Sequence, residues 1–198
     1  MLHLIEELLE SVELDLGIAL NCMPVDICTL IKSVIEGNEA NASNKSQRII
    51  FESEPTPLYA NVDNSRMRHA LDNLLSNAIK YSPHNTTITI SCQKIILTQN
   101  GNHHEQNMTF KDGALPVSYI LVAIKDQGLG LTAEDLGKLF GRFQRLSARP
   151  TGGESSTGLG LSIVKEIVEM HGGKVWAESE GKAKGSTFFV VLPAIVEQ

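Results

Sequence analysis

The sequence predicts an α/β fold in two layers, in which helices cover one face of a mixed, mostly antiparallel sheet. Two observations lead to this prediction. Segments with apolar residues at helical spacing alternate in part with shorter, strand-like segments, and turn residues separate several neighbouring strands as in hairpins. The 198 residues are 42% hydrophobic and 20% charged, which is enough apolar material for one folded domain.

The first quarter of the chain is predicted to contain two helices and two strands. Residues 2–18 place apolar side chains along one stripe of a charged helix, and such a stripe requires another helix as its partner. A second helix is predicted over 24–40, with Pro24 at its start. Residues 48–52 and 58–62 are predicted strands, with a proline-containing turn between them.

The central part is predicted to form a long helix and then a hairpin. The helix covers about residues 64–82, has Asp63 or Ser65 as its N-cap, and ends at Ser82-Pro83. Two strands follow, and the polar stretch between them is too long for an ordinary loop, so we interpret it as an elaborated hairpin end. These strands cover 86–97 and 119–125.

The C-terminal part is predicted to contain two helices and two final strands. Thr132 begins the first helix, and Asp135 can complete a capping box three residues later. The stretch 146–157 has turn composition and little to bury, so we expect it to be mobile. A helix over 159–171 ends at a pair of glycines. The last strands cover 174–179 and 186–192.

Charge and cysteine content argue against several classes of function. The net charge of −6 disfavours a nucleic-acid partner, so an anionic ligand would need a local cation or Mg²⁺. Cys22, Cys28 and Cys92 lack the spacing of a zinc site. The sequence shows neither a signal peptide nor an apolar run of membrane-spanning length. We therefore expect a cytoplasmic domain without membrane contact, whose parent protein can still be membrane-anchored.

The helix over 64–82 carries candidate chemistry on one face. At about 100° per residue, Asn73, Asn77 and Lys80 fall within a narrow arc, while an apolar group that includes Leu71 faces the other way. Amide oxygens are hard neutral ligands that suit Mg²⁺, and lysine is a compact partner for phosphate. Taken alone, this pattern is more typical of a solvated polar surface.

Two glycine-containing segments add further candidates. Residues 126–130 (Asp-Gln-Gly-Leu-Gly) follow an apolar strand, which places a carboxylate at the strand end beside glycines that allow close approach of a ligand. Residues 157–161 (Thr-Gly-Leu-Gly-Leu) begin a helix, where backbone N–H groups and the helix dipole favour phosphate. The second segment matches neither a P-loop nor a dinucleotide-binding fingerprint.

In this order and spacing, the motifs resemble the ATPase domain of histidine kinases, in the superfamily that also contains gyrase, MutL and Hsp90. The similarity extends from Pro24 to Pro193, and the combination is highly specific. It implies a Bergerat-type ATP-binding fold that uses ATP and Mg²⁺. The segments similar to the N box, the first glycine box, the F box and the second glycine box are 71–83, 126–130, 139–145 and 157–162.

The resemblance assigns roles to the matching residues. Asp126 would bind the adenine amino group with Thr187 nearby, Asn77 helped by Asn73 would hold the metal, and two arginines of the F box would meet the γ-phosphate. The catalytic residues would be Asn73, Lys80, Arg142 and Arg145. Further nucleotide contacts would come from Lys80, Tyr81, Gly128, Gly130, Leu131, Phe143, Thr157, Gly158, Leu159, Gly160 and Leu161.

The resemblance also implies a division of the chain and a set of partners. Residues 1–22 would be a remnant of the second dimerisation helix with a linker. Residues 23–198 would be the catalytic ATP-binding domain, with its ATP lid at about 132–157. The partners would be ATP, the dimerisation and phosphoacceptor helices of the parent kinase, and a cognate response regulator.

The implied reaction is transfer of the γ-phosphate to a histidine, for onward transfer to an aspartate of the response regulator. Hydrolases of the superfamily carry a glutamate at the position of Asn73, and asparagine cannot act as a general base. The adjacent Asp72 lies about 100° round the helix and should not replace it. Two alternatives stay open: an anti-sigma-factor-type serine kinase, and a nucleotide-binding regulatory domain without activity.

The phosphoacceptor histidine is expected to lie outside this chain. The family places it in a helix as H-[ED]-x-x-[TN]-P, and none of the six histidines fits that pattern. We therefore predict that the chain does not phosphorylate itself in cis, and that the acceptor helix precedes Met1 in the parent protein.

Overall fold

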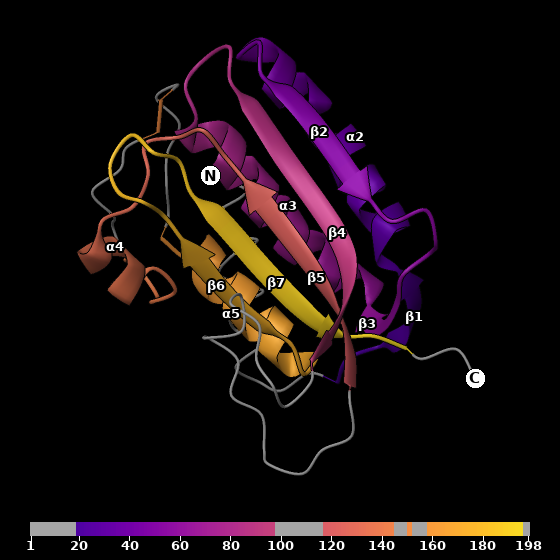
Figure 1. The fold of residues 1–198 in the computed structure, drawn as a ribbon. Helices are drawn as coiled ribbons and strands as arrows, with labels where there is room; N and C mark the ends of the chain where they lie inside the picture. The colour runs from indigo at the N-terminus through magenta and orange to yellow at the C-terminus, as the bar shows by residue number, and fades with distance from the viewer. Residues whose placement is uncertain (1–18, 98–116, 145–149, 152–157, 196–198) are drawn as a thin grey trace.

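A computed structural model describes residues 19–97, 117–144, 150–151 and 158–195. Figure 1 shows one twisted sheet with the long helices behind it, which confirms the predicted two-layer α/β arrangement. The predicted helix over 2–18 and most of the stretch 146–157 lie outside the described residues. None of the helices in the described ranges combines the length and apolar character that a membrane span requires.

The main sheet is mixed and mostly antiparallel, as predicted. Its strands, in spatial order, are β2 (Arg48–Ser53), β4 (Thr87–Leu97), β5 (Val117–Lys125), β7 (Thr187–Pro193) and β6 (Lys174–Glu178). β2 runs parallel to β4, and the other neighbours are antiparallel. Because β4 and β5 pair as far as Leu97 and Val117, the predicted hairpin is confirmed.

A second, two-stranded sheet corrects the prediction for Pro24. The elements concerned are β1 (Cys22–Asp26), β3 (Tyr59–Asp63) and the helix α2 (Ile27–Asn44). Pro24 lies in β1 opposite Asn61, and a strand paired on one side only tolerates a proline. α2 begins after Asp26, whose carboxylate accepts a hydrogen bond from the Cys28 N–H at 3.1 Å. Asp26 is therefore the N-cap that decides where this helix begins.

The helix α3 (Asn64–Tyr81) has the caps and the two faces that its sequence predicts. Asp63 accepts hydrogen bonds from the N–H groups of Ser65 and Arg66, and the chain leaves the helix at Ser82. The apolar face is almost fully buried in the core, each large side chain contributing about 1.5–3 kcal/mol. This packing fixes the rotation of the helix and so the direction of its polar face. The buried residues include Met67, Leu71, Leu74, Leu75 and Ala78.

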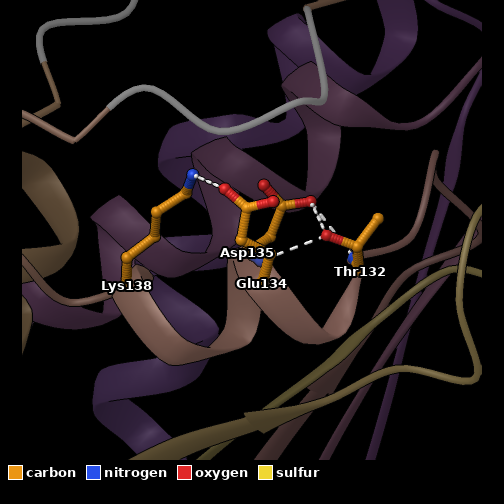
Figure 2. Close-up of polar contacts among 4 residues, drawn as sticks. All are labelled: Thr132, Glu134, Asp135 and Lys138. Carbon is orange, nitrogen blue, oxygen red and sulfur yellow. Dashed lines mark hydrogen bonds and ion pairs between the residues drawn. The ribbon is translucent and has the colours of Figure 1, made fainter.

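The short helix α4 (Ala133–Lys138) begins with the predicted capping box, which Figure 2 shows. The Thr132 hydroxyl accepts a hydrogen bond from the Asp135 N–H at 3.1 Å and donates to the Asp135 carboxylate at 2.7 Å. The same carboxylate accepts from the Thr132 N–H at 3.1 Å. Lys138 and Glu134 form an exposed ion pair at 2.8 Å on the outer side of the helix.

Replacing Thr132 with alanine should lower the free energy of unfolding by about 1 kcal/mol, because the N-cap bond is lost and a donor to the buried Asp135 carboxylate disappears. The matched control is Lys138→Ala, which removes only a solvent-exposed ion pair and should leave stability almost unchanged. Urea unfolding of both variants measures the difference. Equal losses in the two variants would contradict a stabilising role for the capping box.

The helix α5 (Gly160–Met170) is joined to the start of α3 through His171. The imidazole Nδ1–H donates to the Ile167 carbonyl at 2.7 Å, and Nε2 accepts from the Asp63 N–H at 2.9 Å. This pattern requires a neutral ring with its proton on Nδ1. His171 therefore has a structural role, because it ties the end of α5 to the start of α3.

Candidate functional site

A cavity lies between α3, the loop after β5, the first turn of α5 and the start of β7. Six residues predicted for the site from the sequence meet there, and three further residues complete its wall. The predicted six are Asn77, Tyr81, Asp126, Gly130, Leu131 and Leu161. The other three are Leu129, Ser186 and Phe188.

Asp126 is the only carboxylate in this wall among the described residues, and it is 4% exposed. Its Oδ1 accepts hydrogen bonds from the N–H groups of Gly128 at 2.7 Å and Ser186 at 3.2 Å, and its Oδ2 accepts from the Ser186 hydroxyl at 2.5 Å. Burial raises the pKa of this carboxyl, and the bonds from Ser186 and Gly128 offset part of that rise. An ionised carboxylate has about four acceptor positions, so three donors fix its orientation and leave capacity for a ligand.

The glycines after Asp126 are required by close backbone packing. A Cβ atom on Gly128 would lie 2.7 Å from Asp126 Oδ1 and 2.8 Å from the Tyr81 carbonyl oxygen. Gly130 has φ +67°, and a Cβ there would lie 2.0 Å from the Gly181 carbonyl oxygen. Any side chain at these positions would therefore displace the loop that holds Asp126 against the end of α3.

The structure places Ser186 beside Asp126, where the sequence had predicted Thr187. Side chains alternate along a strand, so Ser186 and Phe188 face the cavity together, while Thr187 is not among the residues that line it. The sequence could have indicated this from Phe188, which is buried. If Phe188 faces inward, Ser186 lies on the same side of the strand and Thr187 lies on the opposite side. The hydroxyl at this site therefore comes from the residue directly after Gly185.

The polar face of α3 divides between two environments. Asn77 lines the cavity, and the buried Asn73 amide nitrogen has no hydrogen-bond partner within the described ranges. Lys80 instead lines a larger, polar cavity of about 460 Å³ between α2 and α3. Asp72 accepts a hydrogen bond from Asn38 of α2 at 2.7 Å, so this carboxylate is directed away from Asn73. The predicted metal and phosphate ligands therefore lie on neighbouring arcs of one helix.

The segments around α5 contribute less to the cavity than predicted. Leu159 is buried, Gly158 has φ +76°, and Gly160 is the first residue of α5, yet only Leu161 of this segment lines the cavity. The N-terminus of α5 has no side-chain cap, so its first N–H groups keep their capacity to donate. Thr157 lies outside the described residues.

None of the described F-box residues, 139–144, lines the cavity. Phe143 is 66% exposed, with φ +57°. Arg142 is held by Glu166 of α5, with its Nη2 at 2.6 Å and its Nε at 3.2 Å from Glu166 Oε1. Arg145 lies outside the described residues. A role of either arginine at the γ-phosphate therefore stays a prediction.

Comparison with known proteins places this site in a family. Residues 62–195 match the model of the histidine kinase-, DNA gyrase B- and HSP90-like ATPases. The sensor histidine kinase WalK of Bacillus subtilis is 37% identical over 142 residues, covering 71% of this chain and 20% of WalK. A WalK sensor protein kinase of Staphylococcus aureus is 29% identical over 197 residues, covering 99% of this chain and 42% of the relative. The chain thus spans 20% and 42% of the length of these two relatives.

Solved structures show the same fold. The nucleotide-free catalytic domain of the histidine kinase ThkA is 25% identical, with a TM-score of 0.66 over 87% of this chain and 95% of that domain. Full-length ShkA in complex with AMPPNP is 24% identical, with a TM-score of 0.73 over 99% of this chain and 36% of ShkA. The family match covers more than half of the chain and includes every residue of the cavity wall. This chain therefore belongs to the histidine kinase-, DNA gyrase B- and HSP90-like ATPases.

Proposed function

We propose that this chain is the catalytic ATP-binding domain of a sensor histidine kinase, which binds Mg-ATP and transfers its γ-phosphate to a histidine on a dimerisation helix. The observation that carries the proposal is the buried Asp126 carboxylate in an otherwise largely apolar cavity, with Asn77 of α3 in the same wall. The names of the relatives, which are sensor kinases, support the same reading.

The adenine end of the site would be formed by Asp126 and its apolar neighbours. A purine ring fits a wall of leucine and phenylalanine, and an exocyclic amine needs one acceptor of fixed orientation. Asp126 supplies that acceptor because Ser186 and Gly128 hold its carboxylate in place. The apolar wall consists of Leu129, Leu131, Leu161 and Phe188.

The phosphate end would be formed by the polar face of α3. The amide oxygens of Asn77 and Asn73 are ligands that Mg²⁺ accepts. The Asn73 amide nitrogen, which has no hydrogen-bond partner among the described residues, can donate to a phosphate oxygen. In the described part of the chain, no group of three or more His, Cys, Asp or Glu side chains could hold a metal ion. The nucleotide would therefore supply some of the metal ligands. Bound Mg²⁺ neutralises charge on the phosphates. Lys80 and Arg145 are proposed to contact them.

Phosphate transfer is favoured over hydrolysis because, among the described residues, the α3 face proposed for the phosphates offers no general base to activate water. Asn73 is an amide, and the Asp72 carboxylate accepts a hydrogen bond from Asn38 at 2.7 Å. No described feature favours a serine kinase or an inactive regulatory domain. The proposal includes an acceptor helix and a response regulator as partners, a cytoplasmic location, and a catalytic domain over 23–198.

The proposal is tested by phosphate transfer in trans. The purified chain, incubated with γ-labelled ATP and Mg²⁺, should remain unlabelled and release phosphate slowly. Addition of the dimerisation fragment of the Bacillus subtilis WalK relative should give label on that fragment that is stable in alkali and lost in acid. Acid-stable label would indicate a serine kinase instead. Rapid phosphate release without transfer would contradict the proposal, as would label on the chain alone.

A further inference from the structure

Lys45 is a buried lysine that follows α2 and contacts the last turn of α3. It is 6% exposed, and its ammonium donates to the Ile79 carbonyl at 2.8 Å and the Lys80 carbonyl at 3.1 Å. These carbonyls lie at the C-terminal end of α3, where the helix dipole favours a cation. The contact therefore stabilises the ammonium and orders the turn that carries Lys80 and Tyr81.

The same ammonium also contacts a residue of the chain between α4 and α5. Lys45 Nζ donates to the Thr151 hydroxyl at 2.6 Å, across 106 positions of sequence. Thr151 N–H donates to the Lys80 carbonyl at 3.1 Å, and its hydroxyl lies within hydrogen-bond distance of the carbonyls of Lys80 at 3.0 Å and Ser82 at 2.7 Å. A hydroxyl has one proton, so it accepts from Lys45 and donates to one of these carbonyls at a time.

This contact lies next to the proposed nucleotide site. Tyr81, one residue after Lys80, lines the cavity, and its carbonyl oxygen packs against Gly128 in the loop that holds Asp126. Thr151 belongs to the chain between α4 and α5, where the family resemblance predicts the ATP lid. One buried ammonium thus joins residue 151 to the turn on which two predicted nucleotide contacts lie.

We propose that Lys45 and Thr151 are positioning residues for the nucleotide: their contact fixes residue 151 on the last turn of α3 and thereby raises the affinity for Mg-ATP. Neither residue lines the cavity that contains Asp126, so neither is a catalytic residue. The inference rests on the proposed nucleotide site, and it adds a coupling between the end of α2 and the segment that precedes α5.

A double-mutant cycle tests the contact. The dissociation constant of a non-hydrolysable ATP analogue with Mg²⁺ is measured by calorimetry for wild type, Lys45→Met, Thr151→Val and the double variant. Each single change should weaken binding at least about fivefold, the effect of losing the hydrogen bond between Lys45 and Thr151. Lys45→Met also removes the bonds to the Ile79 and Lys80 carbonyls, so the double variant should be little weaker than Lys45→Met alone. Thr151→Ser keeps the hydroxyl and should bind as wild type.

Gln47→Leu is the matched control. Gln47 Nε2 donates to the carbonyls of Ile79, Ser82 and Pro83 at 3.0–3.1 Å, so Gln47 also orders the end of α3, but it forms no hydrogen bond with Thr151. Gln47→Leu should lower the melting temperature. Gln47 and Thr151 share only the Ser82 carbonyl as an acceptor, so the coupling of Gln47→Leu to Thr151→Val should be smaller than that of Lys45→Met. If the effects of Lys45→Met and Thr151→Val on binding are additive, Lys45 only caps α3 and its contact with Thr151 does not affect nucleotide affinity. That result would overturn the proposal.

The outcomes separate this proposal from the function on which it rests. A wild-type chain that does not bind the analogue overturns both. A wild-type chain that binds, with Thr151→Val and Thr151→Ser equally unaffected, overturns the positioning role alone. If Lys45→Met fails to fold, the two Thr151 variants still test the proposal. Weaker nucleotide binding in Thr151→Val with wild-type binding in Thr151→Ser would show that the hydroxyl is needed.

Discussion

Replacing Asp126 with asparagine should weaken ATP binding by at least about 100-fold without unfolding the domain. Asparagine has the same shape, and its Oδ1 can still accept from the N–H groups of Gly128 and Ser186. The second oxygen becomes an NH₂ group, which would face the amino group of adenine donor to donor. The measurement is calorimetric titration with a non-hydrolysable ATP analogue.

The stability of the same variant should move in the opposite direction. Burial raises the folded-state pKa of Asp126 above the ordinary 3.8, so its contribution to stability is complete below pH 3.8 and is lost as pH rises through the raised pKa. At neutral pH the ionised carboxylate therefore costs stability, and Asp126→Asn should melt at the wild-type temperature or higher. Nucleotide affinity needs the ionised form and should fall as pH decreases through the raised pKa.

Asp72→Asn is the matched control for this charge. Asp72 is an exposed aspartate of α3 whose partner is Asn38, so its replacement should leave nucleotide affinity unchanged. Wild-type affinity in Asp126→Asn would contradict the assignment of Asp126 to adenine. A large drop in the melting temperature of Asp126→Asn would show that the ionised carboxylate mainly stabilises the loop after β5 and that ligand binding is not its main role.

Replacing Asn77 with alanine should abolish the magnesium-dependent part of nucleotide binding. Asn77 is the α3 amide that lines the cavity, and alanine removes its oxygen as a metal ligand. For wild type, an analogue at about 100 times its dissociation constant should stabilise the domain by about 2.7 kcal/mol, a shift of a few degrees. That shift should require Mg²⁺ in wild type and should be small in the variant with or without it.

Asn41→Ala supplies the comparison for Asn77, because Asn41 is an exposed asparagine of α2 that lines the other, polar cavity. It should keep the full magnesium-dependent shift. Thermal unfolding with the analogue, with Mg²⁺ and with chelator covers all cases. A normal shift in Asn77→Ala would place the metal ligand elsewhere on α3, with Asn73 as the first residue to examine.

The sequence was sufficient to predict those helices whose apolar spacing and capping residues lie within or next to the helix itself. The apolar period and the caps of α3 lie within its own sequence, and so does the capping box of Thr132 and Asp135. Pro24 misled because a proline suits both a helix start and an edge strand, and only the pairing of β1 with β3 decides between them. The partner strand lies more than thirty residues away, where periodicity carries no information.

The site shows the same limit. Asp126, Asn77 and Tyr81 meet in one cavity as expected, because each follows from a motif at the end of a strand or on a helix face. Ser186 was missed by one position, since the parity of β7 depends on which side chains enter the core. Lys45 could not be predicted, because its partners are backbone carbonyls and a threonine that only the tertiary fold brings together.

The composition of the cavity wall has a consequence for inhibitor design. Asp126 and Ser186 are hydrogen-bonded to each other within an otherwise largely apolar wall, and the carboxylate of Asp126 is oriented before any ligand arrives. A flat heteroaromatic compound with one exocyclic amine can satisfy both features without carrying phosphate groups. Such a compound would need neither Mg²⁺ nor the cations of α3, so its affinity should be independent of both and should disappear with Asp126→Asn.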